Sequence, residues 1–126
     1  MAITEDTTGG LQKVRWTWTC SSAGAYSEAT TVRFNGSLQE LITIPGTSGD
    51  APTDQYDITI TDANSVDTLG GQGANRSGTA TEYKKASDGL GFVKSSLLTL
   101  NVSNAGDIKQ GTVELYIVDL DKGVVG

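Results

Sequence analysis

A chain of 126 residues, 37% of them hydrophobic, is long enough to fold as one domain, and its 16 glycines predict many turns. The formal net charge of −6 and the pI near 4.4 disfavour nucleic acids and anionic membrane surfaces as partners. The single cysteine, Cys20, excludes an internal disulfide, and the lack of histidine excludes the commonest general base and histidine-ligated zinc.

The N-terminal residues 1–10 are polar and acidic and end in two glycines, so we expect a flexible arm there. We expect a single β-sandwich domain over residues 11–126. The N-terminus has neither the basic nor the apolar segment of a secretory signal, and no apolar run approaches the ~20 residues that span a bilayer. These features predict a soluble chain that is made in the cytoplasm.

The clearest strand signal lies at 13–20, where Val14, Trp16, Trp18 and Cys20 alternate with polar residues. One face of such a strand normally faces the interior of the domain. We therefore expect both tryptophans in the core rather than on a carbohydrate-stacking surface, and we expect Cys20 to be a small buried hydrophobic residue.

Six further short strands follow in chain order, each bounded by turn residues. They are predicted at 30–34, 38–44, 56–61, 66–69, 98–102 and 112–118. Asn35-Gly36 is the dipeptide favoured in a type I′ turn, so it predicts a first hairpin. The turns at 62–65 and 104–107 predict a second and a third hairpin, and residues 79–94 are ambiguous between a weak helix and extended chain.

Seven short strands at regular spacing are typical of an all-β domain in which two sheets bury one face against each other. The sequence therefore predicts an antiparallel β-sandwich, immunoglobulin-like or jelly-roll-like.

The sequence offers no recognisable catalytic, metal or cofactor motif. Oxygen-bearing residues alternate over 62–67, but their spacing is not that of a calcium-binding EF-hand and suits a hairpin turn. The glycines of 70–73 lack the lysine of a phosphate-binding loop. Paired carboxylates, as in a small glycosidase, cannot be seen from spacing along the chain. We expect no enzyme activity and no cofactor.

Several segments resemble small virion proteins of tailed bacteriophages. They are residues 16–18 (WTW), 56–62 (YDITITD), 66–77 (VDTLGGQGANRS), 98–106 (LTLNVSNAG) and 109–111 (KQG). The features shared with this family are strands and turns rather than a chemical motif.

Within this class the small, acidic, β-rich chain is most similar to head decoration (cement) proteins. The resemblance implies a homo-oligomer, a trimer or dimer, that binds the major capsid protein or another virion protein. Such proteins sit on the outside of the capsid and are assembled in the bacterial host cytoplasm. A tail, neck or fibre component and a carbohydrate-binding β-sandwich module are the alternatives.

Three residues in or beside the ambiguous segment, Arg76, Tyr83 and Phe92, are candidate partner contacts, because a sandwich core explains this part of the chain least. The two aromatic residues could equally close one end of the sandwich. The arm at 1–10 is a second candidate contact, which would become ordered on binding.

Overall fold

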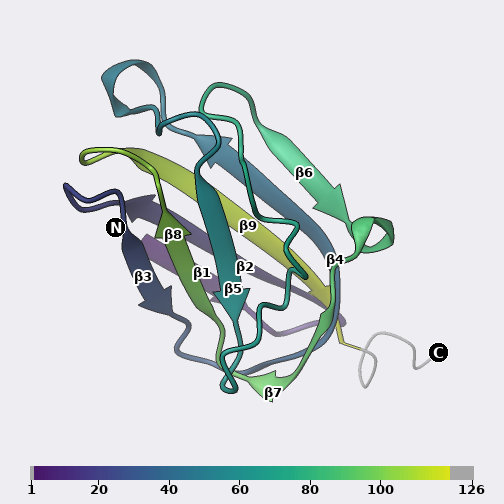
Figure 1. The fold of residues 1–126 in the computed structure, drawn as a ribbon. Coiled ribbons are helices and arrows are strands. Elements are labelled where there is room, and N and C mark those ends of the chain that lie inside the picture. The colour runs from purple at the N-terminus through teal and green to yellow at the C-terminus, as the bar shows by residue number, and fades with distance from the viewer. Residues whose placement is uncertain (1, 120–126) are drawn as a thin grey trace.

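The computed structural model describes residues 2–119 and folds them into two antiparallel sheets (Figure 1). The six-stranded sheet has the order β1-β2-β9-β4-β6, and β7 also pairs with β4. Its strands are β1 (Ala2–Asp6), β2 (Leu11–Thr19), β4 (Phe34–Pro45), β6 (Glu82–Lys85), β7 (Phe92–Ser96) and β9 (Gln110–Val118). The three-stranded sheet consists of β3 (Tyr26–Ala29), β8 (Thr99–Ser103) and β5 (Asp57–Thr61), in that spatial order.

The helical content of residues 2–119 is limited to two 3-10 turns, η1 (Ser48–Asp50) and η2 (Ala86–Asp88). No helix that could cross a membrane occurs in this part of the chain. The prediction of an all-β fold with antiparallel sheets is confirmed, with nine strands in place of about seven.

The two sheets lie face to face (Figure 1), and the side chains between them form one hydrophobic core. Trp16 and Trp18 of β2 are fully buried in it, and the Trp18 ring lies 5.6 Å from the ring of Tyr56. Cys20 is also buried, and its sulfur accepts a hydrogen bond from the Lys109 backbone N–H. The predicted core positions of Trp16, Trp18 and Cys20 are therefore confirmed.

The structure corrects the prediction of a flexible arm at 1–10, because Ala2–Asp6 forms β1 at the edge of the six-stranded sheet. Two contacts hold it there. Ile3 pairs with Trp16 and packs against the core, while the Glu5 carboxylate accepts three hydrogen bonds from Thr31 and Val32. A polar composition did not prevent ordering because one apolar residue and one carboxylate were enough to anchor the strand. The predicted domain range 11–126 includes residues 120–126, which lie outside the described part of the chain.

The predicted turn at Asn35-Gly36 is wrong, since both residues lie inside β4 at an irregularity in its pairing with β7. Gly36 has φ +140, and a Cβ built on it would lie 1.9 Å from the backbone oxygen of Val118 in β9. Glycine is needed here because two backbones approach each other, and not because the chain reverses.

The predicted third hairpin is also wrong: residues 98–102 fall in β8 of one sheet and 112–118 in β9 of the other. β9 instead pairs with β2 and β4 and occupies the centre of the larger sheet. The predicted strand at 66–69 makes only one bridge, Thr61 with Asp67, and the ambiguous segment contains β6 and the first residues of β7. Strand partners were set by contacts across the chain rather than by the nearest turn.

Candidate functional site

The outward face of the six-stranded sheet is the candidate functional site. Strand partners in register project their side chains to the same side of a sheet, so the pairing defines which residues share this face. We call it the outer platform; its residues are Thr4, Asp6, Leu11, Lys13, Arg15, Ser37, Glu40, Ile42, Tyr83, Lys85, Phe92, Glu114, Tyr116 and Val118.

Two of the three predicted contact residues lie on the outer platform. Tyr83 of β6 pairs with Ile42 and is 59% exposed, and Phe92 of β7 pairs with Ser37 and is 76% exposed. Leu11, on the far side of the platform, is 56% exposed. Single exposed apolar residues are normal on protein surfaces, so these three are of interest because they share one sheet face, which makes that face the candidate contact surface.

Charged residues cross the outer platform in one row from strand to strand. The register runs from Asp6 to Lys13, Tyr116, Glu40 and Lys85, on β1, β2, β9, β4 and β6 in turn. The Lys13 ammonium lies 5.5 Å from the centre of the Tyr116 ring, where it is attracted to the negative face of the ring. The row therefore combines aromatic surface with charges of both signs.

A second row of the platform contains an ion pair. Arg15 lies 3.1 Å from the carboxylate of Glu114, which is largely buried although it faces outward. The register continues from Glu114 to Ile42 and Tyr83. Because a guanidinium neutralises the buried carboxylate, the centre of the platform carries no uncompensated charge.

The outward face of the three-stranded sheet has a different chemistry. Asn101 of β8 donates hydrogen bonds to the hydroxyls of Thr59 and Thr61 and accepts one from Ser27. These four side chains satisfy one another and leave hydroxyl groups towards solvent. This face is covered by polar groups that bond one another, whereas the outer platform carries exposed aromatic and charged side chains.

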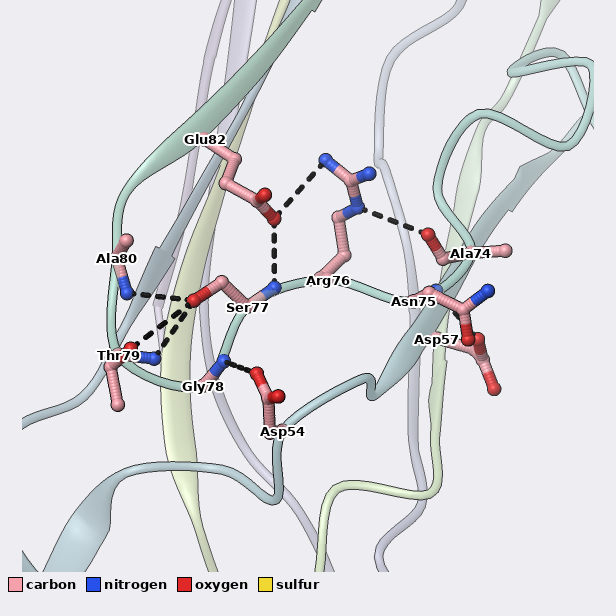
Figure 2. Close-up of polar contacts among 10 residues, drawn as sticks. All are labelled: Asp54, Asp57, Ala74, Asn75, Arg76, Ser77, Gly78, Thr79, Ala80 and Glu82. Atoms are coloured by element: carbon pink, nitrogen blue, oxygen red, sulfur yellow. Dashed lines mark hydrogen bonds and ion pairs between the residues drawn. The ribbon is translucent and has the colours of Figure 1, made fainter.

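The third predicted contact residue, Arg76, is buried rather than presented to a partner. Figure 2 shows its guanidinium directed to Glu82, at 3.5 Å, and its Nε donating to the Ala74 carbonyl. Its backbone N–H donates to Tyr56, which continues the sheet beyond β5. The structure therefore assigns Arg76 to holding the loop together and separates it from Tyr83 and Phe92.

The loop around Arg76 sets the position of β6 (Figure 2). The Glu82 carboxylate that meets Arg76 also accepts the Ser77 backbone N–H at 2.7 Å. Asp54 accepts the Gly78 N–H, so a second carboxylate anchors the same loop. Since Tyr83 directly follows Glu82, these contacts fix the strand that places Tyr83 on the platform.

Burial perturbs one ionisable group close to this loop. It raises the pKa of Tyr56 to about 12, because the phenol lies in the core, where its anion would lose hydration.

The carboxylates of 62–67 serve the backbone, as the turn interpretation predicted. Asp62 accepts the N–H groups of Asn64 and Val66, and Asp67 accepts those of Ile60, Leu69 and Gly71. Among the residues that the structure describes, no group of three histidine, cysteine or acidic side chains could hold a metal ion.

Sequence reasoning missed the platform residues Lys13, Glu40 and Tyr116. Lys13 and Tyr116 each lie on a predicted strand between two buried neighbours, so their outward direction could have been found. Glu40 follows an irregularity of β4 between Leu38 and Glu40 that breaks the alternation, so its direction could not. Their common row could not, because it depends on the register between β9 and its two partners.

Comparison with known proteins adds no identification: no family model, no curated protein and no solved structure matches the chain.

Proposed function

We propose that this chain is a structural protein of a tailed-bacteriophage particle, of the head decoration (cement) kind, and that it works by adhesion through the outer platform. The proposed partner is the major capsid protein or another virion protein, and the proposed place is the outside of the capsid. Assembly would take place in the host cytoplasm.

The observation that carries the proposal is the contrast between the two sheet faces. Tyr83 and Phe92 are exposed on the platform, while Asn101 and its threonine neighbours cover the other face with mutually satisfied polar groups. A protein with one contact face and one hydrated face can bind a larger assembly and leave the rest of its surface in water. The segments that resemble virion proteins supply the identity of the assembly.

Localisation on particles tests the proposal. An antibody against the chain is used to label particles of the phage whose genome encodes it, and we expect label over the head. Label confined to the tail would replace the decoration role with a tail, neck or fibre role. Particles that contain none of the chain by mass spectrometry would overturn the proposal.

A matched pair of variants tests the contact face. Phe92→Ser removes the most exposed aromatic residue of the platform, and Val66→Ser removes an exposed apolar residue, 56% exposed, from the turn after β5. If Phe92 is a central contact, its loss should weaken binding to particles lacking the chain by about thirtyfold, the effect of a truncation worth about 2 kcal/mol. Val66→Ser should bind like the parent, and equal binding of all three proteins would exclude Phe92 as a contact.

A further inference from the structure

We infer that the outer platform pairs with a second copy of this chain, so that two six-stranded sheets pack face to face around a two-fold axis that runs along β9. The inference rests on the proposed function because both take the outer platform as the contact face. It adds that a second copy of the chain binds to this face.

The charge pattern of the platform is complementary to itself. Along the row from β1 to β6 the side chains are Asp6, Lys13, Tyr116, Glu40 and Lys85, with Tyr116 at the centre. A two-fold axis over the central strand reverses this row on the second copy. Asp6 then faces Lys85, Lys13 faces Glu40, and Tyr116 faces its own counterpart, so each charge meets the opposite sign.

The charges of this row form no ion pair among the described residues, and the Asp6 carboxylate accepts hydrogen bonds from the backbone N–H and the hydroxyl of Thr8. Among the described residues, neither Asp6 with Lys13 nor Glu40 with Lys85 comes within ion-pair distance, although each pair is adjacent in the register. Both lysines instead lie over tyrosine rings, Lys13 over Tyr116 and Lys85 over Tyr83. Their ammonium groups remain able to pair with carboxylates of a second molecule.

The residue at the centre of the next row does not oppose this arrangement. Glu114 lies on β9, so the axis brings two copies of it towards each other. Each carboxylate is already paired with Arg15 at 3.1 Å and is largely buried, which removes most of the repulsion. In the same row Arg15 faces Ile42 of the second copy, and its alkyl stem can cover that side chain.

The face is also large enough. The strands β1, β2, β9, β4 and β6 contain 39 residues, which at about 3.4 Å per residue and about 4.8 Å between strands give a face of roughly 640 Å². A stable interface buries about 800 Å² on each partner, which is similar. Aligned packing of two sheets is a standard arrangement in β proteins.

Phe92 falls outside the paired rows. Its row contains Ser37 and Leu11, and β1 has already ended at Asp6, so no strand of the second copy faces Phe92. It stays at the rim of the proposed dimer, where it can contact the particle. In the proposed dimer Tyr83 faces Thr4 of the second copy, so of the two exposed aromatic residues only Phe92 stays available for the particle.

Sedimentation equilibrium of the purified chain tests the inference through charge exchange. We expect the parent protein to have twice the 13.1 kDa mass of the chain, and dissociation should become easier with added salt. Lys85→Glu and Asp6→Lys should each give monomers, and the double variant should restore the dimer. Lys84→Glu is the matched control, because it makes the same charge change on the other face of β6 and should remain dimeric.

A parent mass of 13.1 kDa at every concentration would overturn the inference, and so would single variants that stay dimeric. A dimer that is lost in both single variants and not regained in the double variant would place the interface elsewhere and overturn it as well. Circular dichroism of each variant shows whether the protein is still folded, so that dissociation of the dimer can be distinguished from unfolding.

The proposed function fails separately from this inference. Phe92→Ser should leave the dimer intact while weakening attachment to particles. A monomer that still binds particles would support the proposed function and overturn the dimer. A dimer that never binds particles would support the dimer and overturn the proposed function.

Discussion

Replacement of Gly36 with alanine is expected to lower the free energy of unfolding by about 2–5 kcal/mol. The new Cβ would lie 1.9 Å from the Val118 carbonyl oxygen, so β4 and β9 would have to move apart. The φ of +140 at this position is also unfavourable for alanine. The clash falls between two backbones, which cannot relieve it by a rotamer change. A turn glycine with a positive φ and open space around its Cα would cost only about 1–2 kcal/mol on the same replacement.

Urea unfolding followed by tryptophan fluorescence measures this effect, because Trp16 and Trp18 are fully buried and become hydrated on unfolding. Gly49→Ala is the control, since a Cβ at Gly49 meets nothing within 4 Å. It should change the free energy of unfolding by less than about 0.5 kcal/mol. If Gly36→Ala unfolds at the same urea concentration as the control, the close approach of β4 to β9 is refuted.

Three other replacements probe the loop, the edge strand and the core. Arg76→Met should lower the free energy of unfolding by about 1–3 kcal/mol and speed amide exchange at Ser77, because the Glu82 carboxylate loses its guanidinium but keeps partial hydration. Glu5→Gln should cost about 1 kcal/mol in urea unfolding, since the amide replaces a charged acceptor of three hydrogen bonds. Burial raises the pKa of Tyr56 to about 12, above the value of about 10 in the unfolded chain, so the folded state keeps the proton longer. The urea midpoint should therefore fall as pH rises from about 10 towards 12, and Tyr56→Phe should make this fall smaller.

Each of these expectations has a result that contradicts it. Unchanged amide exchange at Ser77 in Arg76→Met would mean that the arginine does not hold the loop. A Glu5→Gln protein as stable as the parent would mean that β1 is held by pairing alone. An identical alkaline loss of stability in Tyr56→Phe would assign that loss to other groups.

The sequence predicted features that depend on one strand alone. Trp16 and Trp18 alternate with polar residues, and a period of two directly gives the buried face. Turns that use their own side chains were also predicted correctly, as at Asp62, whose carboxylate accepts N–H groups two and four residues further on. In both cases the deciding interaction is local.

Features that depend on distant contacts could not be predicted in this way. Asn35-Gly36 gives the same local signal whether the chain turns or approaches another backbone, and the backbone it approaches belongs to Val118. A charged side chain such as Arg76 is expected at the surface until a partner is known, and here Glu82 is that partner. Tyr83 and Phe92 are exposed on one face, and their contact with a partner stays a prediction.

The position of β9 has a consequence for folding during synthesis. This strand lies at the centre of the six-stranded sheet, between β2 and β4, yet it spans residues 110–118 (Figure 1). Until β9 has been synthesised, β2 and β4 lack the strand that lies between them and pairs with both. Their tryptophan and leucine side chains therefore stay exposed to solvent. The six-stranded sheet can be completed only after residue 118 has left the exit tunnel, so the apolar faces of β2 and β4 stay exposed to aggregation until then.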